Sequence, residues 1–343
     1  MAEKERQYPE MDRLREDMKQ GTVGGLYLFY GEEHYLLQYY LGQLRERLLA
    51  PGTEEFNHRR LEGKGLSVRD LDDALAPYPA FAERTLIEVR DWNPFALPEE
   101  ERKALAELLE NAPEYACLVL LFETEPFKPD KRLKYNDRIL KCFRTVEFGL
   151  QSREKLLRWV VNRSAKLGAR IDRDTAEYLL FVGGSSMTSL DPELAKLCSY
   201  ANGIVTKEDV DRIVTPVVEA VAWRLTEALT SRRYGEAMAT LGKLLELQEP
   251  VHRIIAAVSS ELRRLLMTKL WLEERRPTAE LRELGLFRYD FQVQKTVSAA
   301  RSQSLAWCAR SVRLCSETAM RLNSEKAEYE DIIRAFVAEL ALG

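Results

Sequence analysis

The sequence contains few of the residues on which metal sites, disulfides and histidine-based catalysis depend. Its 343 residues include three histidines, which lie far apart at His34, His58 and His252. Its five cysteines include no C-x-x-C pair and stand at Cys117, Cys142, Cys198, Cys308 and Cys315. An odd, scattered set of cysteines in a long chain is typical of a reduced protein rather than of a disulfide framework or a zinc site. We therefore expect a cytoplasmic protein without a metal site.

Long hydrophobic runs and an excess of either charge are also missing. The longest apolar run, residues 116–122, is far shorter than the roughly 20 residues needed to span a membrane. The first twenty residues carry charges throughout and have no apolar centre, so we expect no secretory signal peptide. With 51 Lys and Arg against 55 Asp and Glu, the net charge of −4 excludes a broadly basic nucleic-acid binder, but not a local basic patch.

The first 150 residues alternate between short apolar segments and amphipathic ones. The apolar segments predict strands at residues 26–30, 56–61, 85–89, 116–122 and 143–148. Helical periodicity occurs between them at residues 33–49, 66–75, 99–111 and 131–140, with Ser67 as an N-cap. This alternation predicts an α/β domain with a largely parallel sheet, in which residues 116–122 form a strand that is buried on both faces.

After Phe148 the pattern is helical, and no further strand is expected. Helices are predicted at residues 152–167, at residues 172–181 and from Asp191-Pro192-Glu193 onward, and Thr206 to Asp209 has the form of a capping box. From Pro216 the chain reads as a bundle of five or six helices, at residues that include 251–275, 291–300, 304–322 and 326–340. We therefore expect three domains, at residues 1–149, 150–214 and 215–343.

The turn after the first predicted strand is where an α/β domain would bind phosphate groups. Here it reads Gly31-Glu32-Glu33, and the chain contains no G-x-x-x-x-G-K-[ST] motif. Carboxylates would repel a triphosphate at contact distance, so we expect Glu32 and Glu33 to cap the following helix instead. The motifs G-x-S-x-G, H-E-x-x-H and G-x-G-x-x-G are absent as well. The sequence thus favours a nucleotide-binding fold without productive nucleotide binding, without a cofactor and without a catalytic site of its own.

A short segment before the third predicted strand contains Tyr78, Pro79, Ala80 and Phe81. Phe81 has two interpretations, namely a core side chain packed under the strand or an exposed apolar anchor for a partner protein. From these residues alone, both remain open.

Arginines cluster in the last third of the chain, at Arg232-Arg233, Arg263-Arg264, Arg275-Arg276, Arg310 and Arg313. Because acidic residues are interspersed among them, a solvated helix surface is the favoured interpretation, and contact with DNA phosphates is the alternative.

Several segments resemble, in the same order, the delta subunit family of bacterial DNA polymerase III. They are Leu26-Tyr-Leu-Phe-Tyr-Gly-Glu-Glu-His-Tyr-Leu-Leu37, Pro79-Ala-Phe-Ala-Glu-Arg84 with the strand that follows, and Leu190-Asp-Pro-Glu-Leu-Ala-Lys-Leu197 with Tyr200. The resemblance extends over nearly the whole chain. It implies an AAA+-like α/β module without a working P-loop, a small helical lid-like domain and a C-terminal helical collar that joins other subunits.

The resemblance also implies a function within the clamp loader of the replicative polymerase. The subunit would bind the beta sliding clamp and open the ring, or hold it open, for loading onto primed DNA. Other subunits (delta-prime, gamma/tau) would be held through the collar, and ATP hydrolysis and nucleotidyl transfer would take place elsewhere in the assembly. The segment matching Ala80 and Phe81, with Pro79 and Tyr78, would enter the hydrophobic pocket of the clamp. Ala80 is small where the family usually has Leu or Phe, so anchoring would depend on Phe81.

Two other classes of protein remain open on the sequence. One is an ATP-binding AAA+ relative of the clamp loader, similar to delta-prime, although the acidic first turn argues against it. The other is a non-catalytic helical adaptor unrelated to replication.

Overall fold

A computed structural model describes residues 8–246, 249–324 and 328–342 of the chain. The chain forms two compact units. The sheet unit extends to Leu156 and also includes Ser185–Asp191, whereas the helical unit consists of Leu157–Gly184 and the chain from Pro192 onward.

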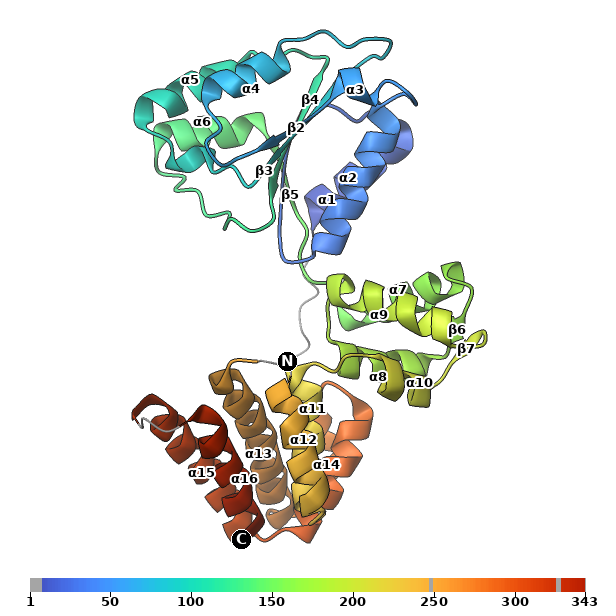
Figure 1. The fold of residues 1–343 in the computed structure, drawn as a ribbon, viewed down its shortest axis with the longest axis vertical. Helices are drawn as coiled ribbons and strands as arrows, with labels where there is room; N and C mark the ends of the chain where they lie inside the picture. Colours follow the sequence, from blue (N-terminus) through green and yellow to red (C-terminus); the bar gives the residue numbers. More distant parts are fainter. Residues whose placement is uncertain (1–7, 247–248, 325–327, 343) are drawn as a thin grey trace. The chain divides into compact units, whose positions relative to one another are not determined.

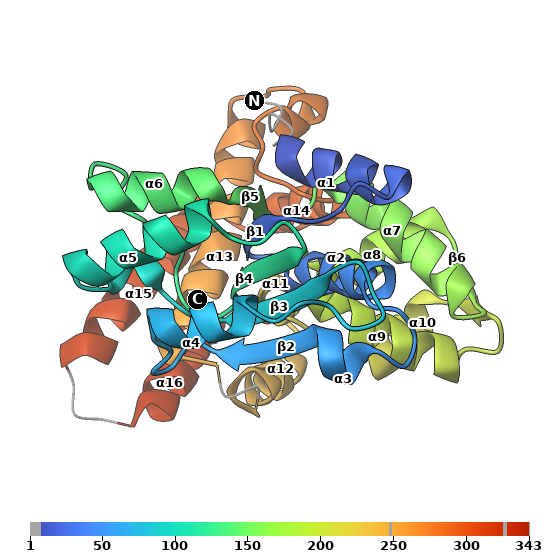
Figure 2. The ribbon, with the colours of Figure 1, turned by 90° about the horizontal axis from the view of Figure 1, so that it is seen from above.

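The sheet unit is built on five parallel strands in the order β2-β3-β4-β1-β5. Figure 2 shows the strand labels in this order. The strands are β1 (Leu26–Tyr30), β2 (His58–Glu62), β3 (Thr85–Arg90), β4 (Ala116–Phe122) and β5 (Arg144–Glu147). All seven residues of β4 are buried, which confirms the expectation for residues 116–122. The predicted α/β architecture with a parallel sheet is therefore correct.

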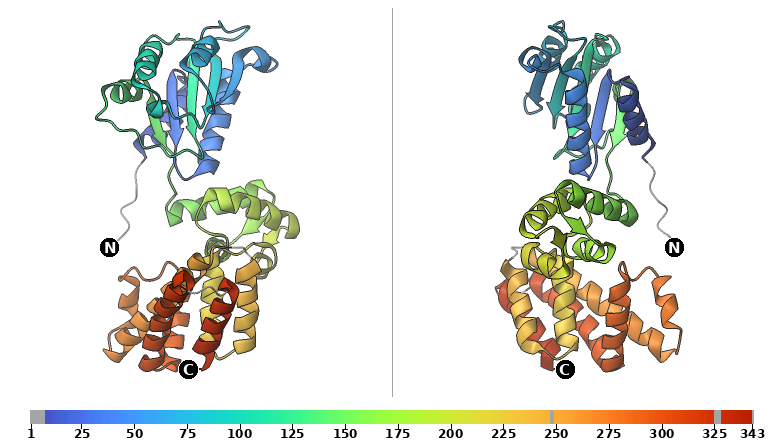
Figure 3. Two further views of the ribbon diagram at one scale, coloured as in Figure 1. Left: turned by 60° about the vertical axis from the view of Figure 1, so that its left-hand side comes forward. Right: turned by 90° about the vertical axis from the view of Figure 1, so that its right-hand side faces the viewer.

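Helices cover both faces of this sheet, as Figures 1 and 3 show. One face packs against α1 (Pro9–Gln20) and α2 (His34–Leu48). The opposite face packs against α4 (Val68–Leu75), α5 (Glu99–Glu110) and α6 (Lys134–Cys142). Two short elements complete the unit, α3 (Glu54–Asn57) and the 3-10 turn η1 (Pro94–Ala96). Ser67 caps α4 in a capping box with Asp70, as predicted for Ser67.

One boundary in the sheet unit differs from the sequence prediction in a way that matters for the site. Residues 56–61 were expected to form a strand, but Phe56 and Asn57 belong to the helical turn α3, and β2 begins at His58. The pattern along β2 is mostly exposed, because this strand lies at the edge of the sheet. The weak apolar signal of an exposed edge strand does not fix where the strand begins.

The helical unit begins within α7 (Arg153–Lys166) and contains α8 (Arg173–Gly183), α10 (Lys207–Ile213) and most of α9 (Met187–Tyr200). It includes two very short parallel strands that were not expected, β6 (Arg170–Ile171) and β7 (Ile204–Val205). The predicted capping box at Thr206 and Asp209 is present. The predicted helix start at Asp191 is wrong, because α9 already begins at Met187 and Pro192 lies inside it.

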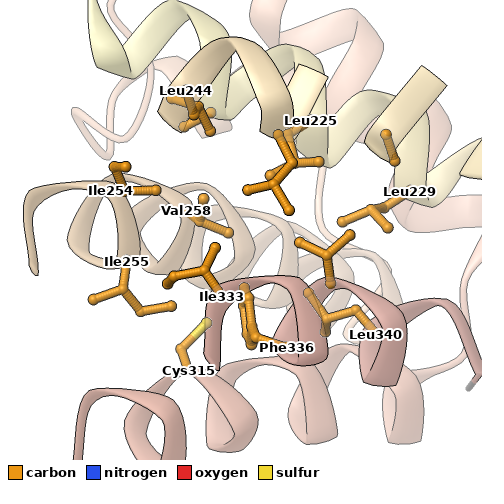
Figure 4. Packing of buried hydrophobic residues seen from close by; sticks show 14 of the residues in the cluster. Leu225, Leu229, Leu244, Ile254, Ile255, Val258, Cys315, Ile333, Phe336 and Leu340 are labelled. Carbon is orange, nitrogen blue, oxygen red and sulfur yellow. The ribbon is translucent and has the colours of Figure 1, made fainter. Parts of the chain in front are cut away.

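The remainder of the chain is an all-helical bundle. It consists of α11 (Val218–Thr230), α12 (Tyr234–Glu246), α13 (Val251–Glu273), η2 (Thr278–Arg282), α14 (Asp290–Ser302), α15 (Leu305–Ser324) and α16 (Tyr329–Leu342). Side chains of α11, α12, α13, α15 and α16 converge on one hydrophobic core, shown in Figure 4, in which Phe336 and Val258 are fully buried. Among the described residues, no helix is both long enough and apolar enough to cross a membrane.

A buried charged group joins one helix and two strands of the sheet unit. Glu88 of β3 has no solvent exposure, and its two carboxylate oxygens accept hydrogen bonds from Nε and Nη2 of Arg45 on α2, both at 2.6 Å. Nε2 of His58, the first residue of β2, lies 2.7 Å from Oε1 of the same carboxylate. Burial acts to raise the pKa of Glu88, but the hydrogen bonds from Arg45 and His58 outweigh burial and lower this pKa to about 2. The carboxylate is therefore ionised in the folded protein.

The low pKa of Glu88 predicts how the sheet unit responds to acid. In the unfolded chain a glutamate titrates near 4.5, so the stabilisation from ionised Glu88 is complete above that pH and is lost as the pH falls towards 2. Glu88→Gln should lower the free energy of unfolding by about 3 kcal/mol at pH 7, because it removes one member of a buried ion pair. Its stability should also vary less than that of the wild type between pH 4.5 and pH 2.5 in urea titrations.

The matched control is Glu110→Gln, which breaks an ion pair between Glu110 and Arg138 on the surface of the same unit. It should leave the unfolding curve nearly unchanged, since water screens exposed pairs. Equal effects of the two substitutions would contradict a special role for the buried group.

Candidate functional site

The loop between α4 and β3 carries two strongly exposed aromatic side chains. We call residues 77–84 the Phe81 loop. Phe81 is 92% exposed and Tyr78 is 82% exposed. The ring of Tyr78 packs against that of Tyr115, with 4.7 Å between the ring centroids, whereas Phe81 has no aromatic neighbour among the described residues. Phe81 is thus not a core residue beneath β3, and an exposed apolar side chain of this size is a candidate contact for another protein.

The backbone at Phe81 is held in an unusual conformation. Its φ of 56° lies in the left-handed region, which costs a residue with a side chain roughly 1–2 kcal/mol. The adjacent residue, Ala80, is bound on both sides of its backbone by the side chain of Asn57. The Ala80 N–H donates to Oδ1 of Asn57 and the Asn57 amide donates to the Ala80 carbonyl, each at 2.7 Å. Asn57 is itself only 1% exposed.

The end of the Phe81 loop is fastened by Arg84. Its Nη1 donates to the carbonyl of Glu114 at 2.6 Å, in the turn that leads into β4. The guanidinium group also lies against Gly24, where a Cβ would stand 2.6 Å from Nη1. Gly24 has a φ of +149°, so a side chain at this position would be both strained and obstructed. The arginine therefore fixes the loop to the segments before β1 and β4.

Asn57, which contacts the Phe81 loop, was not identified from the sequence. The sequence predicts Asn57 to lie within a strand. Its hydrogen bonds to Ala80 join residues that are 23 positions apart in the sequence. Phe56, its neighbour in the chain, is 63% exposed. The sequence shows only an asparagine and an aromatic residue just before an edge strand. Local sequence does not reveal which distant loop Asn57 contacts.

The turn that follows β1 is closed tightly by the chain itself. Gly31 has a φ of +134°, and a Cβ there would lie 2.2 Å from the carbonyl oxygen of Phe148. That oxygen accepts the backbone N–H of Glu33 at 2.8 Å. Gly31 is required by this close approach to the segment after β5, and the turn presents no glycine-rich loop for a phosphate group.

The side chain of Glu33 turns away from the helix that it was expected to cap. Helix α2 has no side-chain cap, and Glu32 is exposed. The fully buried carboxylate of Glu33 instead accepts the backbone N–H groups of Met187 at 2.8 Å and Thr188 at 2.9 Å, and the Thr188 hydroxyl at 2.7 Å. Capping by Glu33 at the start of α2 was therefore the wrong expectation. The carboxylate stabilises the first turn of α9, which explains why that helix begins at Met187.

A second carboxylate organises the edge of the sheet where β3 and β4 end. Oδ1 of Asp91 accepts the N–H groups of Glu123, Thr124 and Glu125, at 2.8, 2.9 and 3.2 Å. Although burial opposes the effect, these bonds and the Thr124 hydroxyl lower the pKa of Asp91. The backbone donors at this edge are thus engaged by the protein's own acid. No cluster of three possible metal ligands occurs among the residues that the structure describes.

Comparison with known proteins connects this geometry to a family. The family model described as "DNA polymerase III, delta subunit" matches residues 27–148, and the one described as "DNA polymerase III delta subunit, C-terminal domain" matches residues 219–340. Together these segments cover more than two thirds of the chain.

Individual relatives agree with the family models. The DNA polymerase III subunit delta of Bacillus subtilis is 27% identical over 270 residues, which cover 75% of this chain and 76% of that protein. A probable DNA polymerase III subunit delta of Aquifex aeolicus is 23% identical over 259 residues, covering 73% and 72%. Among solved structures, the DNA clamp loader delta protein of Bacillus subtilis aligns with a TM-score of 0.51 and 22% identity over 97% of this chain and all of that chain.

The fold and the matched segments define the class of the protein. Its fold, a parallel five-stranded α/β unit followed by a helical region, is that of the solved DNA clamp loader delta protein, and this fold agrees with the expectation from the sequence. Within that class, the chain belongs to the family of DNA polymerase III delta subunits.

The contacts of Glu33 lead to a prediction about the start of α9. Glu33→Ala should lower the free energy of unfolding of the sheet unit by about 2–3 kcal/mol, because three hydrogen bonds to a buried carboxylate disappear. Hydrogen exchange at the amides of Met187 and Thr188 should become faster in the variant. Glu32→Ala is the matched control, since Glu32 is adjacent in sequence and exposed, and it should change neither quantity. Unchanged protection at both amides in Glu33→Ala would contradict this account of the helix start.

Proposed function

We propose that this delta-family subunit binds the beta sliding clamp through the Phe81 loop and opens the ring, or holds it open, for loading onto primed DNA. The observation that supports this proposal most directly is the 92% exposure of Phe81 in a loop fixed by hydrogen bonds at Ala80 and Arg84. The sequence resemblance assigns clamp binding to the same segment. Tyr78, Pro79 and Ala80 are the proposed neighbouring contacts.

Burial of Phe81 can supply only part of the free energy of binding to the clamp. Burial of one phenylalanine side chain contributes roughly 1.5–3 kcal/mol, so Phe81 cannot supply the whole affinity of a stable complex. Tyr78, which is also exposed, is the next candidate. Binding shifts the ring towards the open form only to the extent that the subunit binds the open form more tightly than the closed one.

We also propose that the subunit acts without hydrolysing ATP. A phosphate group at the turn after β1 would need free backbone N–H donors and a nearby lysine. Here the Glu33 N–H is bound to Phe148, and the Glu33 carboxylate is buried against α9. Gly31, Glu32 and Glu33 thus form a degenerate nucleotide-site turn. Hydrolysis that drives the assembly would then occur in other subunits, and nucleotidyl transfer in the polymerase.

The helical bundle from residue 215 onward is the proposed collar. Helices α11, α12, α13, α15 and α16 share one hydrophobic core, which suits the bundle to a structural role in assembly. We propose that it joins delta-prime and gamma/tau subunits, that residues 150–214 form a separate lid-like domain, and that primed DNA is contacted only in the assembled loader. The subunit would act in the cytoplasm.

Clamp binding gives the first test of this function. Calorimetry with the purified sliding clamp should show binding by the wild-type chain and an affinity at least tenfold lower for Phe81→Ala, from the lost apolar burial. The substitution removes an exposed side chain, so the thermal unfolding curve should not move. Ile204→Ala is a suitable control, because Ile204 is also an exposed apolar side chain, 66% exposed in the helical unit, and its loss should leave clamp binding unchanged.

The outcomes of this measurement separate the candidate functions. Binding that survives Phe81→Ala would move the contact to another surface of a clamp-binding subunit. Absence of binding by the wild type would contradict clamp binding as the function of this delta-family chain.

Nucleotide binding gives an independent test. The isolated chain, titrated with a fluorescent ATP analogue and Mg²⁺, should show no saturable binding, because backbone donors at the turn after β1 and at the ends of β3 and β4 are already engaged. The same titration with Glu33→Ala should also show none, since the chain has no P-loop lysine at this turn. Saturable binding by the wild type would support the ATP-binding, delta-prime-like alternative.

A further inference from the structure

A buried asparagine lies under the Phe81 loop, where an apolar residue would be the ordinary choice. Asn57 is 1% exposed, and a buried amide is tolerated only when its polar atoms are bonded. Both ends of its side chain bond to a single residue, Ala80, at 2.7 Å each. The amide therefore mimics the neighbouring strand of a β-ladder and fixes the peptide groups on either side of Ala80.

These two bonds are the main restraint on the middle of the loop. In the described structure, no other backbone N–H or carbonyl of residues 77–83 has a hydrogen-bond partner. Phe81 follows directly, and its left-handed φ of 56° is not supported by packing of its own side chain, which is 92% exposed. A strained conformation of this kind persists only when the surrounding structure determines it. Asn57 is the nearest group that does so.

Asn57 immediately precedes the buried charged group of the sheet unit in the chain. The next residue, His58, begins β2 and contacts the carboxylate of Glu88, which is bound on its other side by Arg45. A series of contacts thus connects α2 to the Phe81 loop: Arg45 of α2 binds Glu88 of β3, and Glu88 contacts His58 of β2. Asn57, the residue before His58, binds Ala80 in the loop. A rigid path of this kind is what positions a contact residue accurately.

We propose that Asn57 is a positioning residue, which holds the Phe81 loop in its clamp-binding conformation before the clamp arrives. This inference rests on the proposed function, because it concerns the same contact. Preorganisation raises affinity by increasing the fraction of molecules that are competent to bind. Loss of Asn57 should therefore reduce the rate of association, whereas loss of Phe81 removes a contact and should increase the rate of dissociation.

The test measures clamp binding kinetics by surface plasmon resonance with the full chain. Asn57→Ala should weaken binding by about 5- to 30-fold, which corresponds to the conformational cost at Phe81. Most of that loss should lie in the association rate. In a Phe81→Ala background, the same substitution should have a clearly smaller effect, so the two residues should be coupled in a double-mutant cycle.

Two further variants keep the test decisive. Asn57→Asp fills the same space and retains the acceptor for the Ala80 N–H, but it loses the donor for the Ala80 carbonyl, and it should weaken binding even if Asn57→Ala fails to fold. Asn111→Ala is the matched control, because the Asn111 amide also donates to a backbone carbonyl, that of Glu107, but on α5. It should leave both rates unchanged.

The possible results separate this inference from the proposed function. If Phe81→Ala weakens binding while folded Asn57→Ala and Asn57→Asp do not, the positioning role is wrong and the clamp contact stands. If Asn57→Ala weakens binding equally with and without Phe81, Asn57 acts through general stability and the positioning role is again wrong. If neither Phe81 nor Asn57 matters, the contact proposed for this loop fails.

Discussion

The carboxylate of Glu88 lies inside the sheet unit without solvent exposure, a position that an ionised acid tolerates only with partners on every side. Arg45 and His58 supply those partners, and each comes from a different element of the unit. Because β2 is an edge strand with a mostly exposed face, this polar group does what apolar burial cannot do there, namely hold the strand in register against β3. The position of the residue just before β2, Asn57, follows from that register, and so does the position of the loop it binds.

A second buried carboxylate, that of Glu33, belongs to the turn after β1, where phosphate groups would bind in a nucleotide-binding α/β fold, but it bonds to the first turn of α9. Backbone N–H groups at the first turn of a helix attract any anion, whether it is a bound phosphate group or a carboxylate of the protein itself. In this chain the anion is supplied from within and the helix is α9, more than 150 residues along the sequence. The fold keeps the geometry of an anion site and fills it with its own side chain.

Much of the fold could be predicted from the sequence because its strongest signals are local. The seven buried residues of β4, the capping boxes at Ser67 and Thr206, and the apolar stripe of α13 each carry their structural meaning within a few residues. The errors share the opposite property. The start of α9 depends on Glu33, and the start of β2 and the role of Asn57 depend on segments more than 20 residues away. The sequence left two interpretations of Phe81 open, a buried core residue and an exposed contact, because periodicity does not reveal which residues of a turn are exposed to solvent.

The connectivity of the sheet has a consequence for how the chain acquires its structure during synthesis. The interior strand β1 pairs with β4 and β5, whose residues are synthesised long after it, so β1 remains unpaired until they have emerged from the ribosome. The unit remains incomplete even when β5 has emerged, because the Glu33 carboxylate has no partner until Met187 and Thr188 appear. At the usual pace of about 5–20 residues per second, this last step trails β5 by several seconds. Through that interval only the Glu33 carboxylate is left without its partners, whereas the bundle that follows can form from neighbouring helices as they arrive.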